Sequence, residues 1–443
     1  MAVIGSGAAG LSAAHNLREH ATVTLYEAAD RPGGHAHTVE VSDAGRVLGL
    51  DTAFIVYNEP NYPELMRLFT DLGVEGVEHP GRFSFYDLDT GSCYVSDDFT
   101  LTEEEVRRTC PPEFLGLWRE AQRFHRESAR DFVRRRVDMP LGEYLERNGY
   151  SEEFRHGFVV MMCSTAWVVP AEKIWEMPAA TIIAFFMAHG SQPLGGSGVP
   201  WRTVRGGSIT YVRRAVEELR AAGGSLELRT PVHGVRTEPD GSGVEVRTAR
   251  GSRRFDQVVV ATHADQALAV LDEPTDLQRR LLSTIRYHPS TAILHTDPAV
   301  MPADRDRWRS WNYGRITRHG EPLPWVVYHL NQLHRLDATT DYLVSVESPI
   351  APRDETVISE IPYSHPTFDL PARQVQFEID AINEGSPVKF AGSYFHSRSF
   401  GPDSLGNHDT AVGAGRSAAE CVVRDLPTTT GSPELVTTKG GVR

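Results

Sequence analysis

The sequence predicts an α/β fold in which a parallel sheet with its helices is interleaved with an α+β part of mixed sheet and helices. Three observations predict this fold class. Residues 2–4 form a short apolar run that enters a glycine-rich turn and then a helix. The same alternation of strand and helix returns at 205–261 and at 390–424. Between these segments, residues 101–190 have a helical composition, and residues 285–350 alternate aromatic and polar residues as strands do.

At 443 residues the chain is too long for one ordinary core, and we expect two domains of roughly 200 residues each. A polar, irregular stretch is expected from 28 to 47, and a disordered Thr/Gly/Ser/Pro-rich tail at 426–443. The strands expected around the parallel sheet are 2–4, 22–27, 48–56, 225–229, a hairpin at 232–248 that turns at Asp240-Gly241, and 258–261. The helices expected there are 11–19, 62–72, 209–222 and 415–424.

The composition limits the partners of the protein. A net charge of −14 argues against nucleic acid or an anionic membrane as the main partner. No run approaches the ~18 apolar residues that would span a bilayer, so no integral membrane segment is expected. The chain opens directly on a strand and a glycine turn, which leaves no room for a signal peptide, and we expect a cytoplasmic protein. The four cysteines show no Cys-x-x-Cys spacing and are expected to be reduced thiols.

The first turn carries a nucleotide-binding fingerprint. Gly5-Ser6-Gly7-Ala8-Ala9-Gly10 fits G-x-G-x-x-G. The first glycine makes the tight turn, the second lets the backbone approach a pyrophosphate, and the third lets the helix pack close to the strand. Free N–H groups at the helix N-terminus favour the phosphates. Glu27 ends the next expected strand, where a carboxylate accepts hydrogen bonds from ribose hydroxyls. The sequence therefore predicts a dinucleotide site.

The segment that follows Glu27 distinguishes between dinucleotides. Arg31-Pro32-Gly33-Gly34 forms an R-x-G-G segment, whose backbone and cation can brace the pyrophosphate and ribityl side of a long, buried cofactor. An ordinary surface loop would account for Arg31 alone but not for the whole spacing. The predicted cofactor is therefore FAD rather than NAD. Only one G-x-G-x-x-G occurs, so oxygen, a quinone or a partner protein would reoxidise the flavin in a net oxidation.

Further segments carry a family resemblance that covers nearly the whole chain to about residue 424. They are 33–38 (GGHAHT), 51–58 (DTAFIVYN), 204–208 (VRGGS), 260–265 (VATHAD), 294–297 (LHTD), 308–313 (WRSWNY) and 363–366 (YSHP). With these segments the sequence resembles the superfamily of flavin-containing amine oxidases and phytoene desaturases. More narrowly, it looks like the bacterial predicted NAD/FAD-binding proteins often encoded near cyclopropane fatty acid synthases.

The resemblance implies a Rossmann-like FAD-binding domain (GR2 type) interleaved with the α+β substrate domain, the two meeting over the isoalloxazine ring. The FAD-binding domain would comprise residues 1–75, 205–270 and 385–425. The substrate domain would comprise residues 76–204 and 271–384. The resemblance thus predicts that the parallel sheet is assembled from three separate segments of the chain.

The same resemblance implies the contacts with FAD. In such folds the residue at Val232 holds the adenine through its backbone, and the strand ending at Ala261-Thr262 passes the pyrophosphate. The start of the last helix points its N–H groups at the pyrimidine edge of the flavin, where a helix N-terminus stabilises negative charge. The residues expected to bind FAD are Gly5, Ser6, Gly7, Ala8, Ala9, Gly10, Glu27, Ala28, Arg31, Gly33, Gly34, His35, Thr52, Ala53, Phe54, Val232, Ala261, Thr262, Gly392, Ser393, Asp409, Thr410, Ala411 and Val412.

The segment 392–409 departs from the family pattern. Relatives of the narrower group carry a Gly-Phe-His-Glu-Asp-Gly type segment after the last strand, whereas here only His408-Asp409 stand in for part of it. His396 and His408 flank this segment and titrate near neutral pH, so both are candidates for acid–base catalysis. Tyr394 and Tyr328 are the aromatic candidates for the catalytic site.

Amine oxidation is disfavoured by the positions of the lysines. Flavin amine oxidases often use a lysine that holds a water against flavin N5. Neither Lys173 nor Lys389 lies where that motif is expected. Four aromatic residues could still form a cage for a substrate, with ordinary packing as the alternative for each. They are Tyr57, Trp325, Tyr328 and Tyr394.

Several histidines have simpler explanations than catalysis. His35-Ala36-His37 lacks a third ligand nearby, so we expect no metal site. Covalent attachment of the flavin through His35 is a second alternative. His329 and His334 are expected to play structural polar roles, with substrate contact as the alternative.

Two features concern the substrate. Arg123, Arg126, Arg130 and Arg134 recur on one helical face, which is either a solvated face or a docking site for a carrier-protein phosphate. The apolar stretches 158–169 and 181–188 are core helices that could also line a tunnel for a long hydrophobic substrate.

Together these observations predict an FAD-dependent dehydrogenase or desaturase that removes hydride from a C–H bond of a hydrophobic, acyl or polyketide-like substrate. His408 or His396 would take the second proton. A redox-neutral isomerase, an amine oxidase and a flavin-binding protein without catalysis are the alternatives. The sequence leaves the oligomeric state open.

Overall fold

The computed structural model describes residues 1–189 and 199–426, so most of the tail expected to be disordered lies outside the described residues. A five-stranded parallel sheet forms its nucleotide-binding half, in the order β19–β13–β1–β2–β9. These strands are β1 (Ala2–Ile4), β2 (Thr24–Tyr26), β9 (Ser225–Glu227), β13 (Val258–Val260) and β19 (Val388–Phe390). Three distant stretches of the chain therefore build one sheet.

Helices pack against this sheet, and the first and last of them cross closely. They are α1 (Ala8–Leu17), α10 (Ile209–Ala221) and α15 (His408–Arg424). Nearby, α2 (Pro63–Asp71) packs on α15, and α11 (Ala264–Val270) packs with α12 (Asp276–Thr284). A Cβ at Gly415 of α15 would lie 2.1 Å from the carbonyl oxygen of Ala9 in α1. Only glycine allows these two helices to approach so closely.

A seven-stranded mixed sheet forms the second half, in the order β18–β14–β17–β16–β15–β6–β7. Its strands are β6 (Phe83–Asp87), β7 (Cys93–Val95), β14 (Arg286–His295), β15 (Trp311–Arg318), β16 (Glu321–His329), β17 (Leu343–Val346) and β18 (Val357–Thr367). Only β6 and β15 pair in parallel. The combination of a parallel sheet with this mixed sheet confirms the predicted fold class.

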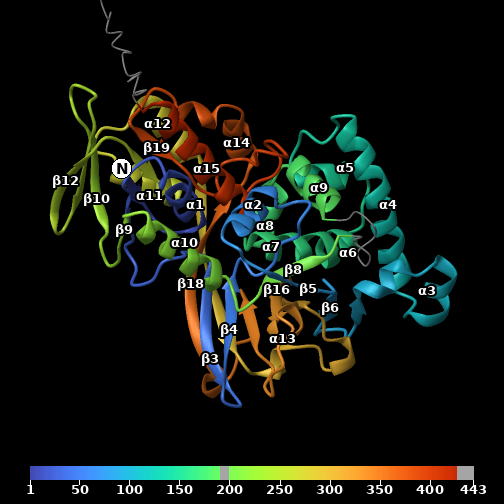
Figure 1. Ribbon diagram of the computed structural model, residues 1–443. Coiled ribbons are helices and arrows are strands. Elements are labelled where there is room, and N and C mark those ends of the chain that lie inside the picture. The colour runs from blue at the N-terminus through green and yellow to red at the C-terminus, as the bar shows by residue number, and fades with distance from the viewer. Residues whose placement is uncertain (190–198, 427–443) are drawn as a thin grey trace, which may run out of the picture.

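Helices from the middle of the chain gather beside the mixed sheet, on the side away from the small sheet formed by residues 232–255 (Figure 1). They are α3 (Glu103–Thr109), α4 (Phe114–Val133), α5 (Leu141–Arg147), α6 (Glu152–Phe154), α7 (Met161–Trp167), α8 (Ala171–Glu176) and α9 (Ala179–Ala188). A π-helical turn, η2 (Arg155–Val160), leads into α7. Such turns are rare and occur frequently at functional sites.

Smaller elements complete the structure. The remaining strands are β3 (His37–Asp43) with β4 (Arg46–Ala53), β5 (Gly76–His79) with β8 (Trp201–Val204), and β10 (Val232–Thr237), β11 (Val244–Thr248) and β12 (Gly251–Phe255). The remaining helices are short: α13 (Leu330–Leu333), α14 (Leu370–Gln374), η1 (Ser96–Thr100), η3 (Pro298–Val300), η4 (Arg305–Arg307), η5 (Asp354–Thr356), η6 (Val375–Phe377) and η7 (Ile379–Asn383).

Three expectations about elements were wrong. The stretch 28–47 is not irregular throughout, because His37–Asp43 forms β3 and pairs with β4. The strand expected at 48–56 ends at Ala53, because Phe54 takes a left-handed conformation with φ 50°. The last helix begins at His408 rather than at residue 415, since the Asn407 side chain accepts a hydrogen bond from the N–H of Thr410 and caps it.

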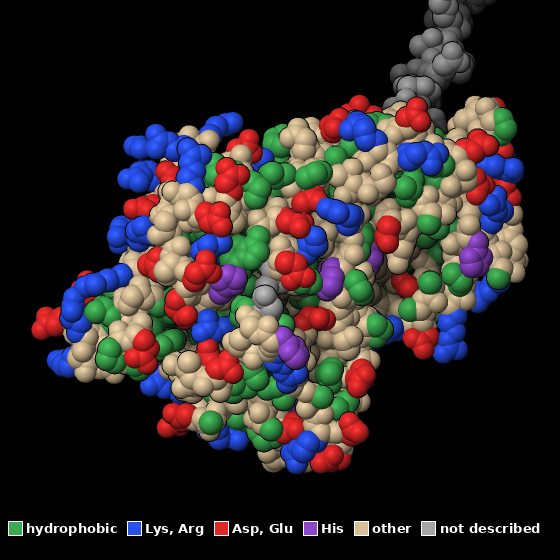
Figure 2. Space-filling model, turned by 180° about the vertical axis from the view of Figure 1, so that it is seen from behind, with side chains coloured by type: hydrophobic (Ala, Val, Ile, Leu, Met, Phe, Trp, Pro, Cys, Tyr) green, Lys and Arg blue, Asp and Glu red, His purple; other side chains and the backbone are tan. Residues whose placement is uncertain are grey.

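The surface and the thiols agree with the composition. All four cysteines are free. Among the described residues, every helix is too short or too polar to cross a membrane. On the face shown in Figure 2, acidic and basic side chains are interspersed rather than gathered into one patch.

Candidate active site and flavin cradle

The turn between β1 and α1 requires glycine at three positions for two different reasons. A Cβ at Gly5 would lie 2.7 Å from the carbonyl oxygen of Ala261, and one at Gly10 would lie 1.8 Å from the carbonyl oxygen of Gly5. A Cβ at Gly7 would meet nothing within 4 Å. The packing of the protein itself therefore explains Gly5 and Gly10, whereas Gly7 borders open space, as the second glycine of a pyrophosphate cradle should.

The backbone around this turn presents free donors. Gly7 is the N-cap residue of α1 and makes no side-chain cap, so the first N–H groups of the helix remain available to an anion. The Gly33-Gly34 segment packs directly against the turn. The backbone N–H of Gly33 donates to the carbonyl oxygen of Ser6 at 2.9 Å, and the guanidinium group of Arg31 donates to the carbonyl oxygen of Gly34 at 3.0 Å.

Glu27 ties the end of β2 to the turn. One of its carboxylate oxygens accepts hydrogen bonds from the N–H and the hydroxyl of Ser6, at 2.9 and 2.6 Å. The other accepts a hydrogen bond from the N–H of Ala29 at 2.9 Å. The Ala28 side chain beside it is exposed. Glu27 thus lies at the carboxyl edge of the sheet, beside the strand β1 at which the strand order reverses, where α/β folds bind nucleotides.

Segments from other parts of the chain converge on the same place. The Ala261 N–H donates to the carbonyl oxygen of Ile4 at 2.7 Å, which brings Thr262 beside Gly5. The Ser12 hydroxyl of α1 donates to the carbonyl oxygen of Val412 in α15 at 2.7 Å. Ser393 follows β19 and Gly392, and its carbonyl oxygen accepts a hydrogen bond from the Thr410 hydroxyl at 3.4 Å. Val232 opens β10, outside the parallel sheet.

A cavity of about 330 Å³ adjoins this convergence, within the size range of small-molecule sites. Thr52, Ala53 and Phe54 line one wall together with Asn407 and His408. Apolar and aromatic side chains line most of the rest: Ile55, Val56, Tyr62, Phe83, Met162, Ala166, Trp167, Val168, Phe185, Phe186, Trp201, Ala292, Trp311, Tyr313, Tyr328, Val346 and Leu405. Ser290, Tyr363, His365 and His189 add polar atoms. None of the described lining residues is Asp, Glu, Lys or Arg.

The comparisons with known proteins agree with this geometry. The family model described as flavin containing amine oxidoreductase matches residues 8–316. The chain belongs to this family. Its cofactor is FAD, because the family is flavin-containing and the residues around Gly7 fit a dinucleotide. A search of curated protein sequences gave no match.

Solved structures of this flavin family share the fold. The chain is similar to a putrescine oxidase bound to putrescine (16% identity, TM-score 0.69, covering 96% of this chain and 98% of that chain). It is similar to a putative protoporphyrinogen oxidase from Exiguobacterium sp. 255-15 (16%, 0.65, 96% and 98%). It is also similar to a CLA-producing fatty acid isomerase from P. acnes (15%, 0.64, 96% and 98%). Identities this low show the fold alone.

The four catalytic candidates do not lie together in this flavoprotein. Tyr328 and His408 line the cavity, whereas Tyr394 and His396 do not. Burial lowers the pKa of His408 to about 3, and its Nε2 lies 2.9 Å from the Tyr211 hydroxyl. An ion pair with Asp380 raises the pKa of His396, and Tyr394 is fully buried.

Phe54 connects the cavity wall formed by Thr52, Ala53 and Phe54 to α15. Its ring stacks on that of His408 at 4.4 Å between centroids. A left-handed backbone is strained for a bulky side chain and persists only where the surroundings enforce it. The strain is therefore stored in the wall that the sequence assigns to the flavin.

A cluster of histidines and a tyrosine underlies the cavity, and sequence reasoning missed it. The ring of His35 lies 4.8 Å from that of Tyr363 and 5.2 Å from that of His365. The Tyr363 hydroxyl lies 2.7 Å from the Thr52 hydroxyl and 3.3 Å from His37 Nδ1. Burial lowers the pKa of His35 to about 3 and that of His37 and His365 to about 4. All three rings are therefore neutral at pH 7, and the cluster adds no charge to the flavin site.

The remaining sequence candidates lie outside the cavity. Lys389 is buried in β19, where its ammonium donates to the carbonyl oxygen of Asn383 at 2.6 Å. Lys173 on α8 pairs with Glu176 at 2.9 Å. Of the four residues of the expected aromatic cage, only Tyr328 lines the cavity. Trp325, for example, packs on the other face of the mixed sheet, against Tyr86.

Of the four arginines expected on one helical face, Arg123 is engaged in contacts within the protein and the other three are exposed. Arg123 lies over the ring of Tyr150 at 4.0 Å and near Glu120 at 3.6 Å. Arg126, Arg130 and Arg134 are exposed on α4 and at its end. His329 pairs with Asp341 at 3.2 Å, a structural role of the kind expected.

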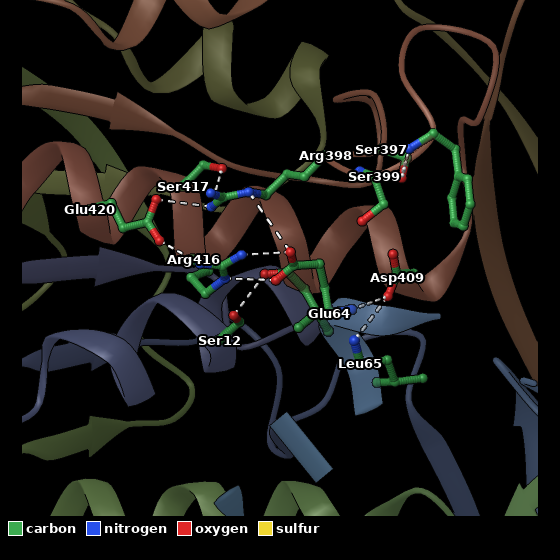
Figure 3. A network of polar contacts seen from close by, with 12 residues as sticks. Ser12, Glu64, Leu65, Ser397, Arg398, Ser399, Asp409, Arg416, Ser417 and Glu420 are labelled. Atoms are coloured by element: carbon green, nitrogen blue, oxygen red, sulfur yellow. Dashed lines mark hydrogen bonds and ion pairs between the residues drawn. The ribbon is translucent and has the colours of Figure 1, made fainter. Parts of the chain in front are cut away.

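A network of charged side chains holds α15 against α2 (Figure 3). Asp409 is 1% exposed, and one of its oxygens accepts hydrogen bonds from the N–H groups of Glu64 and Leu65 at 2.7 and 2.9 Å. It thereby caps the N-terminus of α2. Glu64 in turn receives two hydrogen bonds from Arg416, both at 2.6 Å, and lies near Arg398 at 3.8 Å. The start of α15, where the flavin is expected, is fixed by this network.

The Asp409 carboxyl should make stability depend on pH. Burial raises the pKa of Asp409 to about 7, although two backbone N–H groups and Arg416 oppose the shift. An acid whose pKa is higher in the folded state binds its proton more tightly there. Its contribution to stability is therefore present at low pH and lost as pH rises from about 4 to about 7, by up to about 1.4 kcal/mol per pH unit.

We expect Asp409→Asn to remove this loss, because the amide cannot ionise and its oxygen still accepts from Glu64 and Leu65. Thermal midpoints of both proteins, measured at half-unit steps between pH 5 and 8, check this. The difference between wild type and variant isolates Asp409 from the histidines. If the thermal midpoints of wild type and variant change with pH in the same way over this range, Asp409 does not have the raised pKa described above.

Proposed function

We propose that this flavoprotein is a dehydrogenase or desaturase that removes hydride from a C–H bond of an uncharged, hydrophobic acyl or polyketide-like chain. The observation that carries the proposal is the cavity lining, which holds no acidic or basic side chain besides histidine among the described residues. An ammonium or carboxylate group there would have no partner, and burying an unpaired charge is strongly unfavourable. Bound FAD supplies the acceptor for the hydride.

The residues of the chain would bind the substrate and handle the proton. The aromatic walls around Trp311 and Tyr313 offer apolar contact to a chain. His408 and His365 are the histidines that we propose as acceptors of the second proton, since both are neutral and face the cavity. Burial raises the pKa of Tyr328 to about 12, so its hydroxyl stays protonated and can donate a hydrogen bond to a substrate oxygen.

We also propose the division of the chain that the resemblance implied. Residues 1–75, 205–270 and 385–425 would form the FAD-binding domain, which is supported by the strands of the parallel sheet. Residues 76–204 and 271–384 would form the substrate domain. The narrower likeness to proteins encoded near cyclopropane fatty acid synthases and a carrier protein as partner remain predictions.

Anaerobic titration of the purified holoprotein tests the function. We expect a neutral long-chain acyl thioester to bleach the flavin absorbance, and putrescine and cyclohexylamine to leave it unchanged. Bleaching by an amine would favour amine oxidation instead. Consumption of the acyl compound while the flavin stays oxidised would favour isomerisation, the activity named for the P. acnes protein of similar fold.

A further inference from the structure

A second cavity of about 160 Å³ lies beside the first. Its walls come from α8 and from the ends of β14 and β18, with Met177, His288 and Phe368 among the lining residues. Lys173 and Arg286 also line it, and each is partly exposed and paired with a carboxylate of Glu176 or Asp369. The second cavity therefore combines an apolar interior with a charged rim.

The paired strands β14 and β18 contribute residues to both cavities. In β14, His288 lines the second cavity, and Ser290 and Ala292 line the first. In the paired strand β18, Thr367 lines the second and His365 the first. Alternate residues of a strand face the same side, so His288, Ser290 and Ala292 share one face of β14, and Thr367 and His365 share one face of β18.

Trp167 separates the two cavities and is the one described residue that lines both. It ends α7, and the chain then reverses at Val168, which has a φ of 51°. Val168 lines the first cavity and Val169 the second. The ring of Trp167 is 9% exposed and is held edge-on against Phe185, with centroids 4.9 Å apart.

The first cavity alone is small for a chain. Thr52, Ala53, Phe54 and His408 form one of its walls, and these are the residues expected next to the flavin, so part of the 330 Å³ belongs to the cofactor. Trp167 belongs to the wall of this first cavity, and the second cavity lies on the other side of it.

We propose that the two cavities are one substrate channel divided by Trp167, which makes Trp167 the residue that determines the chain length accepted. The proposal rests on the hydrophobic chain substrate proposed above. When the Trp167 side chain no longer blocks the way, the far end of a longer chain enters the second cavity, and a polar group at that end lies at the rim formed by Lys173 and Arg286.

Binding of straight-chain primary alcohols, from hexanol to hexadecanol, tests the proposal without requiring turnover. Binding to the holoprotein is followed by the change in the flavin spectrum. Each added methylene should tighten binding about fourfold until the chain reaches Trp167, after which affinity should level off. In Trp167→Ala the gain should continue for at least two further methylenes, which makes the longer alcohols about tenfold tighter or more than in wild type.

Two controls make the result specific. Trp167→Ala combined with Thr367→Trp, which fills the second cavity, should restore the wild-type limit. Trp325→Ala removes a buried tryptophan that lines neither cavity, on the other face of the mixed sheet, and should leave the limiting length where it is. Trp167→Leu serves if the alanine variant loses its flavin or its fold.

The outcomes separate the two proposals. An unchanged limit in a flavin-bound Trp167 variant, or a longer limit that Thr367→Trp does not reverse, would overturn the role of Trp167 alone. If no alcohol of any length binds to wild type, the hydrophobic substrate fails, and the divided channel fails with it. A limiting chain length that increases in Trp167→Ala and returns to the wild-type value in the double variant supports both the hydrophobic substrate and the divided channel.

Discussion

Replacing Gly7 with alanine is expected to leave a folded protein that has lost most of its affinity for FAD. The added Cβ would meet no protein atom within 4 Å, so the fold has room for it. The space it enters is the approach to the backbone of the turn, where we place the pyrophosphate. Overpacking costs about 1–3 kcal/mol, which corresponds to a Kd about 5- to 150-fold weaker. Titration of the apoprotein with FAD, followed by flavin fluorescence, measures the change.

Gly10→Ala is the matched control for Gly7→Ala. Its Cβ would lie 1.8 Å from the carbonyl oxygen of Gly5, so α1 and β1 must move apart. We expect this variant to lose stability without FAD as well as with it, as seen in the thermal midpoint of the apoprotein. If Gly7→Ala destabilises the apoprotein as much as Gly10→Ala does, or binds FAD as wild type does, the turn is not the pyrophosphate cradle.

The nucleotide half of the fold could be predicted from the sequence because its signals are local. Gly5 to Gly10 and Glu27 are separated by one strand and one helix, and each has a physical task that the spacing reveals. The apolar run Val258–Val260 predicts a buried strand for the same reason. The parallel sheet confirms the predicted fold class, and the family match to residues 8–316 confirms the predicted cofactor.

The contacts that build the cavity wall could not be predicted, although Thr52, Phe54 and His408 were expected at the site, because these contacts join residues that are distant in the sequence. Tyr363 meets His37 and Thr52 only after β18 has paired with β14 and the β3–β4 hairpin has folded over it. Phe54 lies in an apolar run that favours a strand, and its left-handed turn depends on packing against His408. Periodicity reports which face is buried but not which partner lies opposite.

Asp51→Ala is expected to be among the most destabilising single substitutions in the chain. Asp51 is fully buried near the end of β4, directly before the cavity wall that starts at Thr52. Its oxygens accept hydrogen bonds from the Ser208 N–H at 2.9 and 3.0 Å and from the Ser208 hydroxyl at 2.8 Å. The Thr38 hydroxyl donates to it as well, and His334 lies 4.0 Å away. Burial raises the pKa of Asp51, which the neighbouring His334 opposes.

Removing this carboxylate leaves the buried Ser208 N–H without its acceptor and takes from the Thr38 hydroxyl its hydrogen bond to Asp51. Breaking a buried charged network by deleting one member costs about 3–5 kcal/mol. Denaturation of the holoprotein, followed by circular dichroism and by release of the flavin, measures this loss. The circular dichroism and the flavin release should show their transitions at the same, lowered denaturant concentration, because Thr52, Ala53 and Phe54 continue directly from Asp51 into the cavity wall.

Glu40→Ala, on the same hairpin, is the control for Asp51→Ala. Glu40 is 48% exposed and forms one ion pair with Arg213, so its loss should change stability by about 0.5 kcal/mol or less. The stability of Asp51→Asn should fall between the stabilities of Asp51→Ala and Glu40→Ala. Its amide oxygen still accepts a hydrogen bond from Ser208, whereas its NH₂ group faces other donors. Equal stabilities for the Asp51 and Glu40 variants would mean that the Ser208 loop and the β4 end are held by packing alone. The cavity wall at Thr52, Ala53 and Phe54 would then depend on the stack of Phe54 on His408 rather than on the buried carboxylate.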